Sequence, residues 1–354
     1  MAVQGLSGLS AVLNLKFSDP ITATLRRDVA LLNLIGVVPK ANSSATWGVK
    51  IGARTTAAAK AQGYDVQSSD YSSDARQQAT LAWAHYEAYA AVTGTAQRIS
   101  QANGSAAVSN DILGEELNDA AQELAVKVST HLYSGDVSAT PVEVAGVAVA
   151  IDSSGNYAGI DASTYTTWVS AEATGSLSTL TLDNIRTNVF RPVLDATGKR
   201  PTAVVLPGAL HDKVAALVDP SQRILRPVNS PLGMVDLASM GFVGFQLDGV
   251  PFIEDRHCTS NTMYGLTLDQ LEIQQVPPAW TTMDPGQLSS MLKELSGQVI
   301  DPALVLGMMQ QAQRKLSFQV NALSKTGDSS KLQLVGDFQL CVKRRNAFSK
   351  YTLS

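Results

Sequence analysis

"SNDILGEELNDAAQELAVKVSTHLYSG", residues 109–135, carries the clearest helical pattern in the sequence. Polar side chains at residues 109–111 can cap its start, and Gly135 can end it. Glutamates near the start and His131 near the end suit the helix dipole. The apolar residues recur every three or four positions and would form one face: Ile112, Leu113, Leu117, Ala120, Leu124, Val128 and Leu132. The pattern predicts a helix of about six turns.

Two segments upstream of this helix alternate as strands do. "TWGVKI" (residues 46–51) has the two-residue period. In "TLAWAHYEAYAAVTG" (residues 80–94) the alanines favour a helix, but the same period separates the larger side chains from the alanines. The larger ones would share one face: Leu81, Trp83, His85, Glu87 and Tyr89. We expect a hairpin with a long polar connection that needs a neighbouring subunit, because an isolated two-stranded hairpin is only marginally stable.

The two ends of the chain add an arm and a pair of strands. Residues 1–42 contain one short amphipathic helix between Asp19–Pro20 and Gly36, with its apolar face made by Leu25, Val29, Leu32 and Ile35. Near the other end, residues 315–322 and 332–342 alternate between apolar and polar, which predicts two strands with one buried face each. Gly336 interrupts the second pattern and indicates a bulge or the close approach of another chain.

The middle of the chain, residues 141–276, alternates between helices and strands. Helices are predicted in residues 180–194 and 207–219. Strands are predicted at residues 202–206, 250–255 and 262–273, and the last two bracket a turn and are expected to form a hairpin. Helices and strands together indicate an α+β protein.

The composition is that of a folded protein without a membrane span. The chain has 354 residues, 45% of them hydrophobic, which suggests two or three domains. Its longest apolar run, residues 142–151, is about half of the roughly 20 residues that a membrane helix needs. The first residues do not resemble a signal peptide, so we expect a cytosolic product. Cys258 and Cys341 lie far apart, which favours buried or idle thiols over a disulfide or a zinc site.

The charge balance bears on nucleic-acid binding. The net charge is −4, and the sequence contains no long basic run. A protein that holds phosphates tightly needs clustered cations. Any nucleic acid beside this protein would therefore be held loosely.

"EDRHC" (residues 254–258) contains residue types used by hydrolases and metal sites. Consecutive side chains point in different directions, so closeness in sequence does not bring these groups to one point. None of the four histidines forms a metal-binding pair by spacing. We interpret this stretch as a solvated hairpin turn.

"GIDASTYTTW" (residues 159–168) also has the composition of an active-site loop. The sequence contains no nucleophile motif of the Gly-x-Ser-x-Gly type to which Ser163 could belong. A structural corner explains the same residues: Gly159 permits the turn, Asp161 caps backbone amides and Trp168 anchors the turn. No motif supports an enzyme, and we predict no catalytic residue, cofactor or metal site. A soluble hydrolase using Asp161, Glu254, Asp255 and His257 remains an alternative.

Four stretches, in this order, resemble the major capsid proteins of tailed phages. They are "TLAWAHYEAYAAVTG" with the following helix, "GIDASTYTTW" with "LTLDNIRTNVF", "GVPFIEDRHCTSNTMYGLTLDQLEI", and the terminal "GDFQLCVKRRNAFSKYTLS". Together they span most of residues 45–354. This is the Hong Kong 97 type of fold, which encapsulins share.

The resemblance implies a domain plan and a function. The plan has an N-terminal arm, an extended β-hairpin loop, a peripheral domain with a long spine helix and a β-sheet, a mixed α/β axial domain, and a return through the peripheral sheet; the respective residues are 1–42, 43–95, 96–140, 141–276 and 277–354. Copies would form pentamers and hexamers and then an icosahedral shell around double-stranded DNA, held without sequence-specific binding.

The resemblance also implies partners and a location. The shell would be the capsid of the virion, assembled in the cytoplasm of a host bacterium, with a portal and possible decoration proteins. Some relatives carry a scaffolding segment ahead of the arm. Here the arm begins almost at Met1, so we expect a separate scaffolding protein.

Contacts between subunits are expected at aromatic residues of the extended loop and its strands, namely Trp47, Trp83, Tyr86 and Tyr89. Some members of the family crosslink a lysine of the extended loop to an asparagine of the peripheral domain. The corresponding residues here would be Lys50 or Lys60 with Asn321 or Asn346. Such a bond also needs a buried acid beside them. An encapsulin-like compartment with an enzyme as cargo, and a tail or decoration protein, are further alternatives.

Overall fold

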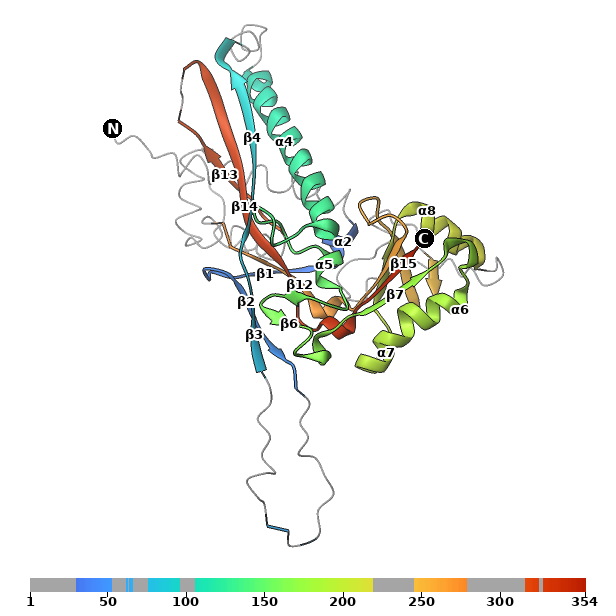
Figure 1. Ribbon diagram of the computed structural model, residues 1–354. Coiled ribbons are helices and arrows are strands. Elements are labelled where there is room, and N and C mark those ends of the chain that lie inside the picture. Colours follow the sequence, from blue (N-terminus) through green and yellow to red (C-terminus); the bar gives the residue numbers. More distant parts are fainter. Residues whose placement is uncertain are drawn as a thin grey trace.

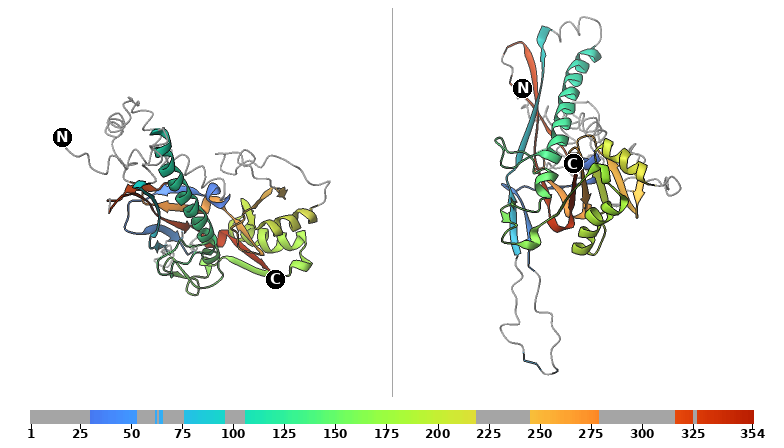
Figure 2. Two further views of the ribbon diagram at one scale, coloured as in Figure 1. Left: turned by 90° about the horizontal axis from the view of Figure 1, so that it is seen from above. Right: turned by 45° about the vertical axis from the view of Figure 1, so that its right-hand side comes forward.

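The structure, a computed structural model, describes residues 30–52, 62, 64–65, 76–95, 106–218, 245–278, 316–324 and 327–354. These residues form an elongated molecule (Figure 1). A long helix and two long strands extend in one direction and a two-stranded hairpin extends in the opposite direction. A compact lobe of helices and strands lies to one side, as the turned views in Figure 2 also show.

A five-stranded sheet runs through the centre of the molecule. Its strands are β1 (Gly36–Pro39), β12 (Leu271–Gln275), β14 (Ser329–Val342), β13 (Gln319–Ala322) and β4 (Ala84–Thr93). β14 pairs antiparallel with β12 and β13 along one edge and with β4 along the other. The predicted pair of strands near the C-terminus is thereby confirmed. β1 comes from the segment expected to be an arm, yet it is a strand of this sheet, parallel to β12.

Helix α4 (Ala106–Ser134) packs on β4 along the outer part of the sheet (Figure 1). Its 29 residues make about eight turns, so the helix begins earlier than predicted. Residues 109–111, which were expected to cap its start, lie inside the helix. Its predicted end at Gly135 is confirmed, and the predicted face is buried where side chains are described: Leu117, Ala120, Leu124, Val128 and Leu132.

The side chains that β4 turns toward α4 include alanines. Ala84, Tyr86 and Ala90 are buried, whereas His85 and Glu87, one position away, are exposed. Neighbouring side chains of a strand point to opposite faces. An alanine adds only a methyl group, so a helix can lie close to this face. β4 is therefore a strand, as predicted. Its alanines, whose propensity favours a helix, leave room for helix α4 to pack against the strand.

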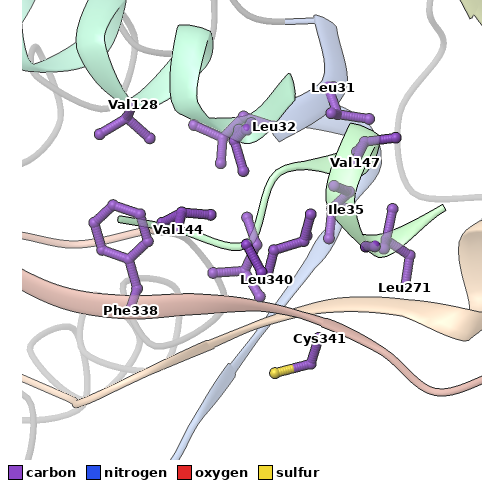
Figure 3. Packing of buried hydrophobic residues seen from close by; sticks show 14 of the residues in the cluster. Leu31, Leu32, Ile35, Val128, Val144, Val147, Leu271, Phe338, Leu340 and Cys341 are labelled. Atoms are coloured by element: carbon purple, nitrogen blue, oxygen red, sulfur yellow. The ribbon is translucent and has the colours of Figure 1, made fainter. Parts of the chain in front are cut away.

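Helices α2 (Ala30–Leu34) and α5 (Val147–Ala150) close the core between α4 and the sheet. Figure 3 shows side chains of α2 meeting Val128 of α4 and Leu340 of β14. The predicted helix of the arm is present from residue 30 and ends before Gly36. The residues ahead of it, with Leu25 and Val29, lie outside the described part of the chain.

The lobe contains a six-stranded sheet in the order β7, β15, β11, β8, β10, β9. In that order the strands are Ala171–Gly175, Ser349–Leu353, Thr262–Leu266, Ala203–Leu206, Val250–Glu254 and Phe245–Leu247. The predicted hairpin between β10 and β11 is wrong, because β8 lies between them. β10 pairs with β9 instead, through a turn at Asp248 and Gly249, which both have positive φ. β15 belongs to this sheet, so the C-terminal segment contributes to both large sheets, not only to the peripheral one.

The helices predicted in the lobe are confirmed. α6 (Leu182–Ile185), a π-helical turn (Arg186–Phe190) and α7 (Arg191–Thr197) form one helical run, and α8 (Gly208–Leu217) follows β8. They bury the lobe's own apolar core against the sheet, including Ile185, Val189, Phe190, Leu210, Val214 and Phe252. No helix of the described residues is long and apolar enough to cross a membrane.

Gly336 lies in β14 opposite Tyr86 of β4, and the pairing continues through it without a bulge. A Cβ atom at this position would lie 2.6 Å from the ring of Phe318. The close approach predicted for Gly336 is therefore made by the same chain and not by another one.

Candidate functional site

The hairpin predicted from residues 46–51 and 80–94 is present in part: β2 (Ala45–Lys50) pairs with β3 (Arg76–Leu81), whereas β4 pairs with β14 instead. The indole of Trp47 donates a hydrogen bond to the carbonyl of Val342 (3.1 Å), and the amide of Thr80 donates one to the carbonyl of Ala158 (3.0 Å). The base of the hairpin is thus attached to its own chain, and the expectation that a neighbouring subunit must support it is wrong for this part. Most of the connection between the strands, with Lys60, lies outside the described residues.

The four aromatic residues expected at subunit contacts fall into two groups. Trp47 and Tyr86 are each only 8% exposed. Their rings pack inside the chain, so for these two the expected role is wrong. Trp83 is half-buried, and its indole donates to the carbonyl of Asn42 (2.9 Å). Tyr89 is 57% exposed on the outer face of β4 and stays a candidate contact, as does Trp83.

The outer face of β4 and β14 carries a polar cluster around Tyr89. His85 Nδ1 lies 2.6 Å from Asp337 Oδ1, and Gln333 donates to Glu87 Oε2 (2.7 Å). The hydrogen bond to Asp337 raises the pKa of His85, although partial burial opposes it. This face is polar and open in the subunit, in contrast to the alanine face that packs on α4.

The corner at residues 159–168 has the geometry of a capped turn. Gly159 has φ +79°, a conformation that favours glycine. Asp161 accepts hydrogen bonds from the backbone amide of Ser163 (2.9 Å) and from its hydroxyl. These bonds lower the pKa of Asp161. Trp168 is buried against Tyr157, with the ring centroids 6.3 Å apart.

Arg345 lies behind this corner, and sequence reasoning did not single it out. Its side chain is 1% exposed. The guanidinium donates to the carbonyls of Ala150 (2.9 Å), Trp168 (3.2 Å) and Asp152 (2.9 Å), and lies over the ring of Tyr157. Burial lowers its pKa. One buried cation, in the turn before β15, thus ties the corner to the end of α5 through backbone carbonyls.

The stretch "EDRHC" is not a solvated turn, because Asp255 is 2% exposed. Its carboxylate accepts hydrogen bonds from Tyr133 Oη of α4 (2.8 Å), from the amide of Leu31 in α2 (3.2 Å) and from the amide of His257 (2.9 Å). Buried carboxylates are tolerated when they are hydrogen-bonded in this way. The carboxylate joins three segments that are far apart in sequence.

The hydrolase alternative finds no assembled site in the described part of the chain. Asp255 is occupied by structural donors, and Asp161 bonds within its own turn. Cys258 and Cys341 are buried free thiols, as predicted, and burial raises the pKa of both. Among the described residues, no group of three His, Cys, Asp or Glu side chains could hold a metal ion.

Comparison with known proteins decides the family. A family model described as "SU10 major capsid protein" matches residues 5–285. The chain belongs to this family of major capsid proteins. The resemblance to phage major capsid proteins that the sequence indicated is therefore confirmed. No curated protein matches the sequence.

Solved capsid structures share the fold of this capsid protein. The Cyanophage A-1(L) capsid asymmetric unit matches with a TM-score of 0.58 and 19% identity over 92% of each chain. The capsid of a native GTA particle matches with a TM-score of 0.55 and 11% identity, over 94% of this chain and 90% of the other. The SrpI encapsulin of Synechococcus elongatus is more weakly similar, with a TM-score of 0.50 and 10% identity over 91% and 86% of the chains.

These findings confirm the α+β phage capsid fold and assign a structural role. Copies of the capsid protein associate into the shell of a virion. The buried hydrogen bonds of the corner and of Asp255 therefore stabilise the shape of one subunit of the shell. Arg345 and Asp255 fix that shape inside the subunit, and the outer face of β4 and the hairpin are the candidate surfaces between subunits.

Asp161→Ala is expected to lower the thermal unfolding temperature of the subunit by a few degrees and to reduce the yield of assembled particles. The substitution removes the acceptor for the amide of Ser163. Because its folded pKa is lowered, this contribution is present at neutral pH and is lost as the pH falls below about 4. Asp161→Asn keeps one acceptor oxygen and is the matched control. Equal melting of wild-type and Asp161→Ala subunits would contradict the capping role.

The two asparagines proposed for a covalent crosslink bond to neighbouring side chains in the described structure. Asn321 Oδ1 accepts from Gln319, and Asn346 Oδ1 accepts from Arg344. Lys50 is exposed at the far end of β2. A crosslink through Lys50 or Lys60 stays a prediction, which the mobility of assembled shells on a denaturing gel would test.

Proposed function

We propose that this capsid protein forms pentamers and hexamers that close into an icosahedral shell around double-stranded DNA. Assembly takes place in the cytoplasm of the host bacterium, with a scaffolding protein and a portal as partners and with possible decoration proteins on the finished shell. Head-to-tail contacts that close into rings are the physical requirement for such capsomers.

The family match over residues 5–285, together with the shape of the subunit, is the observation that supports this proposal most. The hairpin of β2 and β3 and the ribbon of β4, β14 and α4 extend from the centre in opposite directions (Figures 1 and 2). Extensions of this kind can reach adjacent copies. In this proposal residues 43–95 are the extended loop, and Trp83 and Tyr89 lie at subunit contacts.

The charge of the protein suits a container for DNA. The net charge is −4. A strongly basic inner wall would bind phosphates and slow the movement of DNA during packaging, whereas a mildly acidic one leaves neutralisation to small cations. In this proposal the DNA is enclosed without sequence-specific binding.

The contents of the shell test the proposal and separate it from an encapsulin-like compartment. Particles are isolated from cells that express the neighbouring genes, treated with nuclease and opened. Nuclease-resistant double-stranded DNA together with a portal protein is the expected result. Particles that reproducibly contain one cargo enzyme and no protected DNA would contradict the proposal.

A further inference from the structure

His131 and Tyr86 form a buried polar contact at the C-terminal end of α4. His131 is in the last turn of the helix, and both residues are 8% exposed. His131 Nδ1 and Tyr86 Oη are 2.8 Å apart, and the two rings meet edge to face with their centroids 5.7 Å apart. The contact joins α4 to β4 just before the chain leaves the helix at Gly135.

The amide of Val144 fixes the position of the proton in this contact. Its N–H donates to Tyr86 Oη over 3.2 Å. A phenol has a single hydrogen. Tyr86 Oη already accepts from Val144, so its own hydrogen is paired only if it is donated to His131 Nδ1. Burial raises the pKa of Tyr86 to about 12, so the phenol keeps that hydrogen. His131 is then neutral, with its own proton on Nε2, 3.7 Å from Glu143 Oε1.

Few charged groups face His131. Lys127 lies one turn earlier on α4, and Glu143 lies on the segment that follows the helix. Burial lowers the pKa of His131, Glu143 opposes this effect and Lys127 adds to it.

In the described part of the chain, the other elements packed nearby add no charge on this side. Helices α2 (Ala30–Leu34) and α5 (Val147–Ala150) contain no titratable residue. From β14, the ring of Phe338 stacks on Tyr86, and Asp337 bonds to His85 on the opposite face of the sheet. The state of the contact therefore depends on one proton at His131.

We propose that the contact between Tyr86 and His131 is a pH-sensitive joint, which is closed while the imidazole is neutral and opens when it takes a second proton. Once Nδ1 carries a proton it can only donate to Tyr86 Oη, and the hydrogen of Tyr86 loses its acceptor. Val144, in the segment from Asp136 to Gly146 that follows α4, is then held to β4 more weakly, while Ala145 stays bonded to Gln339 and Gly146 to Gly135.

The direction of the pH effect follows from the lowered pKa of His131. Above about pH 6.5 neither the folded nor the unfolded chain binds this proton, and the joint contributes its full stability. As the pH falls below that value the unfolded or opened form takes the proton first, so the closed form loses stability until the pH reaches the lower folded pKa. At pH values below the folded pKa, each unit of pKa depression makes opening about tenfold easier.

Two measurements on the unassembled full-length subunit test this joint. With only four histidines in the chain, nitrogen-15 spectra of histidine-labelled protein resolve the tautomer of each, and His131→Asn identifies its signal. We expect the Nε2–H tautomer at about pH 7.5 and titration below about pH 6.5. A charged His131 at about pH 7.5, or the Nδ1–H tautomer, would overturn the proposal.

Hydrogen exchange of residues 136–146 then reports opening. After correction for the chemical exchange rate, protection in the wild type should fall, by at most about tenfold, between about pH 7.5 and about pH 5.5. His131→Asn places a non-titrating acceptor near the position of Nδ1 and should remove this fall. His85→Gln, on the exposed face of the same strand, should leave it unchanged. Two results would refute the proposal: an equal loss of protection in His131→Asn, or no loss of protection in the wild type.

Should His131→Asn fail to fold, Tyr86→Phe provides a second test. It removes both the donor to Nδ1 and the acceptor for Val144. Residues 136–146 should then exchange rapidly already at about pH 7.5 and respond little to acid. Protection equal to that of the wild type at both pH values would overturn the proposal.

Discussion

Arg345→Met is expected to lower the free energy of unfolding of the subunit by about 3–5 kcal/mol. Methionine fills much of the same space but cannot donate to the carbonyls of Ala150, Asp152 and Trp168. These acceptors would be left in a site that the protein shields from water, and hydrogen bonds to charged groups are among the stronger ones in proteins. Denaturant unfolding of the purified subunit measures the loss.

The neighbouring arginine provides the matched control. Arg344 is exposed, although it also bonds to a carbonyl, that of Ala196. Arg344→Met should cost less than about 1 kcal/mol, because exposed polar contacts contribute little. If Arg345→Met does not fold, Arg345→Lys keeps the charge with fewer donors and should give an intermediate loss. Equal stability of the Arg345→Met and Arg344→Met subunits would contradict the role assigned to Arg345.

Shortening the connection between β2 and β3 is expected to abolish stable shells while the subunit still folds. Lys50 lies opposite Arg76 in the hairpin, so an Asn-Gly pair in place of residues 53–74 leaves a five-residue loop that can close it. Apart from Gln62 and Tyr64–Asp65, the removed residues lie outside the described part of the chain. The free energy of unfolding should change by no more than about 1–2 kcal/mol, since loop length has a weak effect on stability.

Assembly of the shortened protein is measured by sedimentation and electron microscopy beside the wild type. A control in which Tyr64 and Asp65 alone are replaced by alanine keeps the length of the connection. Its assembly separates the effect of length from that of two exposed side chains. Shells formed by the shortened protein in normal yield would show that residues 43–95 do not act as the extended loop.

Local patterns in the sequence were sufficient for the elements but not for their boundaries or pairing. The apolar periodicity from Leu117 to Leu132 predicted the buried face of α4. Its start was placed too late because residues 109–111 are good caps, yet they lie within a helix that begins at Ala106. The hairpin of β10 and β11 was wrong because β8, from a distant part of the chain, inserts between them. The sequences of β10 and β11 contain no signal that a third strand lies between them.

In the site, too, contacts between neighbouring residues could be predicted from the sequence, whereas contacts between distant residues could not. Asp161 bonds to the amide of Ser163, two residues away, so its role could be inferred from neighbouring letters. Asp255 meets partners 122 and 224 residues away, and Arg345 meets a carbonyl 195 residues away. A charged residue in a segment of both polar and apolar residues is expected to be exposed when only its sequence neighbours are considered. The burial of these two residues is set by the fold as a whole.

Electron microscopy of the purified wild-type protein tests the central claim most directly. A capsid subunit must form closed contacts with copies of itself, so capsomer-sized rings or closed icosahedral particles are the predicted result, at some condition of concentration and salt or with the proposed scaffolding protein added. A protein that stays a monodisperse monomer under all of these conditions would contradict the claim.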